Sequence, residues 1–76
     1  MVRAKFRLEN VTSVETKYNK QYTYTFYPVT TGSEENKKFW EYTPAGSLVI
    51  QTTTKLEYFI PGKEYYLDFS EAPNGK

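Results

Sequence analysis

The sequence predicts an all-β domain, folded as a small antiparallel β-barrel or a strongly curved sheet of the SH3-like or OB-like kind. Three observations predict this class. Apolar and polar residues alternate along 2–8, 22–27 and 64–69, which is the period of a half-buried strand. Turn-forming residues separate these runs. Aromatic residues make up 18% of the chain, and large rings can build a core from few aliphatic residues.

The first strand is expected over residues 2–14. Alternate residues at its start are apolar and share the core face: Val2, Ala4, Phe6 and Leu8. The residues between them form a basic row on the opposite face: Arg3, Lys5 and Arg7. The alternation slips at Glu9-Asn10, which indicates a β-bulge or a sharp bend.

A hairpin is expected next, because the polar residues 16–20 predict a tip between two β-rich runs. The second strand is expected over 20–31. Pro28 marks an edge or a further bulge within it, because proline donates no ladder hydrogen bond. The residues expected to face the basic row across this hairpin are Thr23, Thr25 and Tyr27.

One turn of helix or a structured loop is expected after the second strand. Ser33 is a suitable N-cap, since its hydroxyl can accept from an exposed backbone N–H. Glu34 and Glu35 follow where the helix dipole favours negative charge, and Lys37 and Lys38 suit the end of the turn.

Two further strands are expected over 46–53 and 63–70, with a turn at Pro61-Gly62 between them. Residues 55–59 favour a short helical turn. The 76 residues form a single domain, with 71–76 as a frayed tail. The apolar phases of the four strands predict these buried residues: Phe6, Leu8, Tyr24, Phe26, Leu48, Ile50, Leu67 and Phe69.

Composition argues against several classes of function. The chain has no cysteine and no histidine, so it offers no disulfide, no thiolate and no imidazole for acid–base or metal chemistry. We therefore expect no enzyme activity, no cofactor and no metal. The formal charge is +1, from 10 basic and 9 acidic residues. Proteins that bind nucleic acid usually carry a clear excess of basic residues, and this chain does not. No signal peptide or membrane-spanning run is present, which predicts a soluble cytoplasmic protein.

Two surfaces are candidates for binding. The basic row of Arg3, Lys5 and Arg7, with Tyr27 nearby, has the charge and ring chemistry to hold phosphates and stacked bases. A solvated strand face that protects the sheet from aggregation explains the same residues.

The second candidate is the 32–44 loop, whose aromatic residues belong to the types enriched at binding hot spots. Its candidate contact residues are Lys37, Phe39, Trp40 and Tyr42. Phe39 and Trp40 are neighbours, so on an extended backbone one is expected in the core and the other at the surface or in an interface.

Two segments carry a resemblance. Residues 32–37, Phe39-Trp40 and 42–44, together with 59–69, are similar to motifs of a family of small uncharacterised tailed-phage proteins. This resemblance implies a phage origin and a role in the host cytoplasm. It implies no catalytic or binding residue.

The leading expectation is a non-enzymatic phage accessory protein that binds a host or phage protein, or sequesters a nucleotide, in counter-defence. One alternative is a small β-barrel that binds single-stranded nucleic acid or a nucleotide. Another is a minor structural component of the virion. Because so small a core stabilises a fold weakly, we also expect a homo-oligomer, with Trp40 or a neighbouring ring in or beside the contact.

Overall fold

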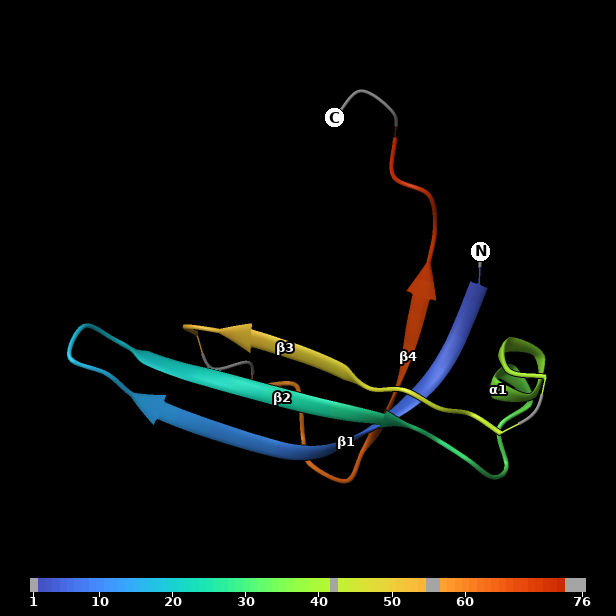
Figure 1. Ribbon diagram of the computed structural model, residues 1–76, viewed down its shortest axis with the longest axis horizontal. Helices are drawn as coiled ribbons and strands as arrows, with labels where there is room; N and C mark the ends of the chain where they lie inside the picture. Colours follow the sequence, from blue (N-terminus) through green and yellow to red (C-terminus); the bar gives the residue numbers. More distant parts are fainter. Residues whose placement is uncertain (1, 42, 55–56, 74–76) are drawn as a thin grey trace.

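The computed structural model describes residues 2–41, 43–54 and 57–73. These form four antiparallel strands in one sheet, in the order β3-β2-β1-β4, and a short helix (Figure 1). The elements are β1 (Val2–Glu15), β2 (Lys20–Pro28), α1 (Glu34–Phe39), β3 (Leu48–Thr52) and β4 (Glu64–Phe69). The sheet curls into a half-barrel, which confirms the predicted all-β class.

Strand β1 is shared between two partners, and this explains the curl. Its first half pairs with β4, from Val2 opposite Phe69 to Arg7 opposite Glu64. From Phe6 to Glu15 it pairs with β2, and the register shifts between Leu8 and Asn10. The predicted bulge is therefore confirmed. At this place β1 bends, so that β4 runs steeply away from the direction of β2 and β3 (Figure 1).

The core lies on the concave face of the sheet. Its buried hydrophobic residues are Ala4, Phe6, Leu8, Tyr24, Phe26 and Val29. The segment between β3 and β4 covers this face, because the Phe59 ring lies 5.6 Å from that of Tyr24 and 5.3 Å from that of Phe26. The Tyr65 hydroxyl fastens the segment: it donates to the carbonyl of Tyr58 and accepts from the N–H of Ile60.

The predicted core is confirmed in its centre and wrong at its margin. Phe6, Leu8, Tyr24 and Phe26 are buried, whereas Leu48, Ile50 and Leu67 are partly buried. Phe69 is 49% exposed, because it ends an edge strand that has a neighbour on one side alone.

Two loop predictions can be compared with the described residues. Residues 57–58 form a turn and residue 59 has no regular structure, so the helical turn predicted over 55–59 is wrong there. Residues 55–56 lie outside the described residues. Residues 71–73 have no regular structure, and 74–76 of the predicted tail lie outside the described residues.

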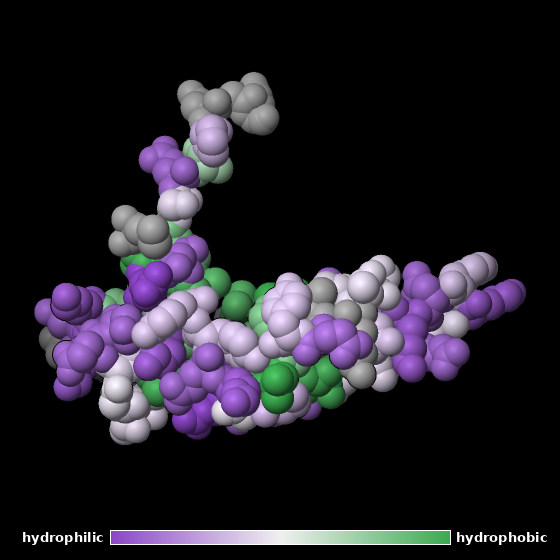
Figure 2. All heavy atoms as spheres, turned by 180° about the vertical axis from the view of Figure 1, so that it is seen from behind, coloured by the Kyte–Doolittle hydropathy of each residue, from purple (hydrophilic) through white to green (hydrophobic). Residues whose placement is uncertain are grey.

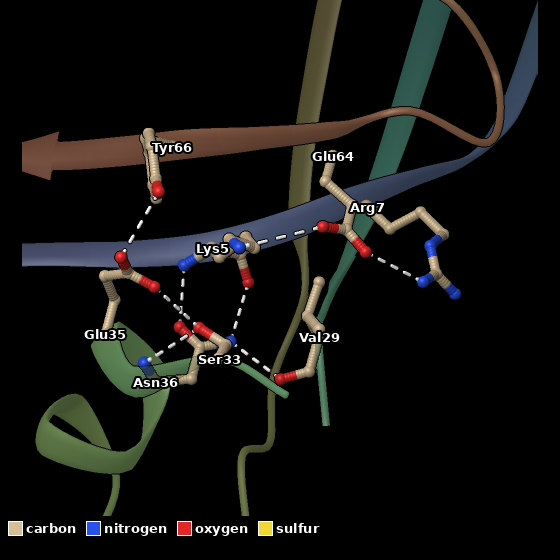
Figure 3. A network of polar contacts seen from close by, with 8 residues as sticks. All are labelled: Lys5, Arg7, Val29, Ser33, Glu35, Asn36, Glu64 and Tyr66. Atoms are coloured by element: carbon tan, nitrogen blue, oxygen red, sulfur yellow. Dashed lines mark hydrogen bonds and ion pairs between the residues drawn. The ribbon is translucent and has the colours of Figure 1, made fainter. Parts of the chain in front are cut away.

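Helix α1 begins as its sequence predicts. The Ser33 hydroxyl accepts from the N–H of Asn36, with Glu34 and Glu35 in the first turn and two lysines in the last. The side chain of Asn36 then joins the helix to β1. Its amide oxygen accepts from the Lys5 N–H at 2.6 Å, and its amide nitrogen donates to the Lys5 and Val29 carbonyls (Figure 3).

Asn36 continues the sheet where β2 ends. The backbone groups of Lys5 face the side of β1 that β2 would occupy if it extended past Pro28. There the Asn36 amide takes the place of a strand residue, and the Val29 N–H donates to the Lys5 carbonyl beside it. Asn36 is 2% exposed, so this contact fixes α1 against the edge of β1.

Candidate functional site

The basic row on the convex face is paired with carboxylates of β4. Arg3 donates two hydrogen bonds to Asp68, from Nε to Oδ1 at 2.6 Å and from Nη2 to Oδ2 at 3.1 Å. Arg7 Nη2 lies 2.9 Å from Glu64 Oε2, and Lys5 Nζ lies 3.8 Å from Glu64 Oε1. The two arginine pairs follow directly from the strand register, which places Arg3 opposite Asp68 and Arg7 opposite Glu64, whereas Lys5 lies opposite Tyr66 and reaches Glu64 diagonally.

Tyr66 links the middle of this row to the helix. The guanidinium carbon of Arg3 lies 4.4 Å from the centroid of the Tyr66 ring, which is cation–π geometry. The Tyr66 hydroxyl donates to Glu35 Oε2 at 3.2 Å (Figure 3). Glu9 adds a further carboxylate, with its Oε2 4.0 Å from Arg7 Nη1. The convex face at this end therefore combines three cations and four carboxylates in one network.

Two carboxylates of the network titrate below their ordinary range. The hydrogen bond and charge of Arg3 lower the pKa of Asp68. The pKa of Glu35 is lowered first by a hydrogen bond from its own backbone N–H and next by the Ser33 hydroxyl. Both groups therefore stay charged at neutral pH and balance the cations.

The expected partners of the basic row are wrong in part. Arg7 faces Tyr27 across the hairpin as predicted, but Arg3 and Lys5 face β4. Thr25 lies opposite Asn10, beyond the bulge. The physical reason is that β2 ends at Pro28, opposite Phe6, so it does not reach the start of β1.

A second surface forms where β1 begins and β4 ends. We call Val2, Phe39 and Phe69 the apolar end surface; their exposed fractions are 52%, 39% and 49%. The Phe39 and Phe69 ring centroids lie 6.1 Å apart. Figure 2 shows hydrophobic residues where the projecting segment that follows β4 meets the body of the molecule, while the hairpin tip is hydrophilic.

Trp40 supports this surface from below. Its ring lies 6.0 Å from that of buried Phe6 and 4.4 Å from that of Phe39. Trp40 is partly buried against the core, while Phe39 reaches the surface. Of the two neighbours, the tryptophan is the core residue and the phenylalanine is the exposed one.

Charged groups surround the apolar end surface. An open hollow of about 430 Å³ lies beside it and is lined by Val2, Arg3, Glu35, Lys38 and Phe39. A patch of exposed rings bordered by both signs of charge is the usual composition of a protein–protein contact.

The other predicted site residues lie apart from this surface. Tyr27 is 47% exposed and lies on the convex face opposite Arg7. Lys37 is exposed on α1, and its Nζ lies 3.5 Å from Glu34. Tyr42 lies outside the described residues.

The sequence did not single out Val2, Phe69 or Asn36 as site residues. Val2 and Phe69 are registered opposite each other at the free end of the β1–β4 pair, and alternation assigns both to the core face. Their exposure depends on where the sheet ends. The signal for Asn36 was its position three residues after the Ser33 cap, on the first turn of a helix beside a strand.

Among the described residues, no group of three ligand side chains could hold a metal ion. No helix of that part of the chain is long and apolar enough to cross a membrane. No protein-family model, curated protein or solved structure matches this chain.

Proposed function

We propose that this chain is a small, non-enzymatic phage accessory protein that binds a host or phage protein in the host cytoplasm. Counter-defence is a role that such binding would serve. The observation that carries the proposal is the apolar end surface, where Val2, Phe39 and Phe69 stay exposed together.

The surface is supported by a fixed base, which favours binding over incidental exposure. Trp40 packs Phe39 against the core residue Phe6. The Asn36 amide holds α1 to Lys5 of β1 through two hydrogen bonds and to Val29, just after β2, through a third. A preorganised aromatic patch loses little conformational entropy when a partner docks.

The convex face supports nucleic-acid binding less well. A strand of nucleic acid gains affinity when free cations displace its counterions. Here Arg3 and Arg7 already have carboxylate partners at 2.6 and 2.9 Å, so phosphates would have to compete with Asp68 and Glu64. A protein partner at the apolar end surface meets no such competition.

Affinity capture from bacterial lysates, before and after phage infection, tests the proposal with two matched variants. Phe39→Ser removes the central ring of the apolar end surface. Tyr27→Ser removes a ring of similar exposure, 47% against 39%, from the convex face. We expect a specific protein that the parent and Tyr27→Ser retain and that Phe39→Ser loses.

Three results would contradict the proposal. One is capture that both variants lose or both retain. Another is incorporation of the chain into virions, which would make it a structural component. The third is retention of nucleotides or oligonucleotides in place of a protein.

A further inference from the structure

The outer edge of β4 offers unpaired backbone groups. Leu8 directs both its N–H and its C=O toward the β4 side, to Lys63 and Gly62, while Lys5 directs its groups to the opposite side. Because these directions alternate along a strand, the pairs of Phe6 with Tyr65 and Ala4 with Leu67 carry the ladder bonds.

The peptide groups of Glu64, Tyr66 and Asp68 therefore point outward. Strand β4 is last in the sheet order, so no described strand accepts them. The opposite situation holds at Lys5, where the Asn36 amide and the Val29 N–H complete the edge of β1.

This edge lacks the usual protection against pairing. Natural edges are blocked by lysine, proline, bulges or a covering element. The β4 sequence Glu-Tyr-Tyr-Leu-Asp-Phe contains neither lysine nor proline, and its register with β1 is regular throughout. Its two charges are already neutralised by Arg7 and Arg3.

We infer that β4 pairs antiparallel with β4 of a second copy of this chain, about a two-fold axis at Leu67, to form a continuous eight-stranded sheet. In this register Leu67 faces Leu67 of the partner subunit, and Tyr65 faces Phe69 of the partner subunit. Three apolar residues of the concave face then become neighbours across the seam: Tyr65 and Leu67, which are partly buried, and Phe69, which is exposed.

Side-chain chemistry selects this register over the nearest alternative. With the axis at Leu67, Tyr66 lies opposite Asp68 of the partner subunit, so no two like charges face each other. With the axis at Tyr66, Glu64 would face Asp68 of the partner subunit. Like charges directly opposite each other destabilise a sheet, and the tyrosine-centred register places two such pairs at the seam.

The shape of the chain agrees with an incomplete sheet. Its radius of gyration is 14.7 Å, whereas a compact domain of this length has about 11 Å. Its accessible surface is 5999 Å² for 8.9 kDa, against about 4,800 Å² for a compact monomer of that mass. Residues 70–73, which follow β4 and are exposed, contribute part of the excess. The whole excess exceeds the roughly 800 Å² per partner of a standard interface.

A pair of variants at one position tests the edge itself. Tyr66→Pro removes an N–H that points outward, so β1–β4 pairing is preserved while the outer edge is blocked. Tyr66→Ala removes the same side chain and keeps the N–H. In sedimentation velocity at micromolar concentration we expect dimers of about 18 kDa, twice the chain mass, for the parent and Tyr66→Ala, and monomers for Tyr66→Pro.

Single cysteines test the register, because the parent has none. At the axis, Leu67 of each copy would form a non-hydrogen-bonded pair with Cα atoms about 4.5 Å apart, within reach of a disulfide. Leu67→Cys should cross-link under mild oxidation. Tyr65→Cys, displaced by two residues from the axis in each copy, should not.

Several outcomes would overturn the inference. A parent that sediments as a monomer removes the dimer, and a Tyr66→Pro dimer moves the contact away from this edge. Cross-linking of Tyr65→Cys in place of Leu67→Cys overturns the register. The proposed protein binding shares Phe69 with this seam and is tested separately, because Phe39→Ser leaves the β4 edge intact and Tyr66→Pro leaves Val2, Phe39 and Phe69 unchanged.

Discussion

The buried side-chain amide of Asn36 makes the hydrogen bonds that a neighbouring strand residue would otherwise make. The three backbone groups that it satisfies belong to Lys5 and Val29, which lie at the end of the β1–β2 ladder. Without it, the Lys5 N–H and the Val29 carbonyl would lose this partner, while the Lys5 carbonyl would keep the Val29 N–H. The position of α1, and with it that of Phe39, depends on this residue.

Replacement of Asn36 by alanine should therefore destabilise the protein strongly. Each buried polar group left without a partner costs about 1–3 kcal/mol, and a domain of this size has about 3–5 kcal/mol in total. We expect Asn36→Ala to be largely unfolded at 37 °C by circular dichroism. Asn10→Ala, at an exposed position of β1, should change the free energy of unfolding by less than about 0.5 kcal/mol. Equal stability of the two variants would contradict this role of Asn36.

Two other single residues predict a pH dependence. The pKa of Asp68 is lowered from 3.8 by Arg3, and the pKa of Glu35 is lowered from 4.5 by its own N–H and Ser33. In this range the unfolded chain binds protons more readily than the folded one, so acid favours unfolding. Stability from these groups is complete above about pH 4.5 and is lost as the pH falls through the folded pKa values.

Urea unfolding between pH 7 and pH 3 measures this effect. The parent should lose stability below about pH 4.5. The double variant Glu35→Gln with Asp68→Asn should be less stable than the parent at pH 7 and should lose less on acidification. If the free energy of unfolding of the variant fell with pH as steeply as that of the parent, other carboxylates would be the cause of the pH dependence. Exposure of both groups keeps the effect small.

At the scale of elements, alternation along one strand predicted faces but not neighbours. The concave and convex faces of β1 and β2, the bulge and the Ser33 cap all follow from local pattern. The partners of Arg3 and Lys5 do not, because they depend on where β2 stops and on β4, which lies more than fifty residues further along the chain. The sequence pattern therefore predicts a row of unpaired cations, whereas in the structure these cations are paired with carboxylates of β4.

The β1–β4 pairing leads to a prediction about charge. The parent should not bind a labelled single-stranded oligonucleotide at 100 mM salt, which fluorescence anisotropy can measure. Glu64→Gln with Asp68→Asn removes the β4 carboxylates from Arg3, Lys5 and Arg7, leaves Glu9 at 4.0 Å from Arg7, and should produce weak binding. Its log affinity should fall with log salt with a slope of about −2, since three contacts to a single strand give roughly −0.7 each.

Tight, salt-sensitive binding by the parent would contradict this prediction and favour the nucleic-acid function. A matched control is Glu15→Gln with Glu71→Gln, which removes two carboxylates that lie outside the network of the basic row. If this control gained equal affinity, net charge and not the freed row would be the cause.

For the whole molecule, the sequence predicts the all-β class, but it does not decide between a closed barrel and an open, strongly curved sheet. Aromatic content and strand period predict a curved sheet, and curvature alone suggests a barrel. The described strands instead leave β3 and β4 at opposite edges. Phe69 was assigned to the core for the same reason, since a period of two cannot show that a strand ends the sheet.

An open sheet that is completed by a second copy should have a stability that depends on concentration. If folding and association are coupled, mass action raises the melting temperature of the parent as its concentration rises. For a domain of this size we expect an increase of roughly 5 °C or more over a hundredfold range, because 1 kcal/mol corresponds to about 4–8 °C. Tyr66→Ala should show the same trend from a lower starting point. Tyr66→Pro, which keeps the fold but blocks the β4 edge, should melt at one temperature throughout. A parent with a constant melting temperature would show that the half-barrel is stable as a single chain.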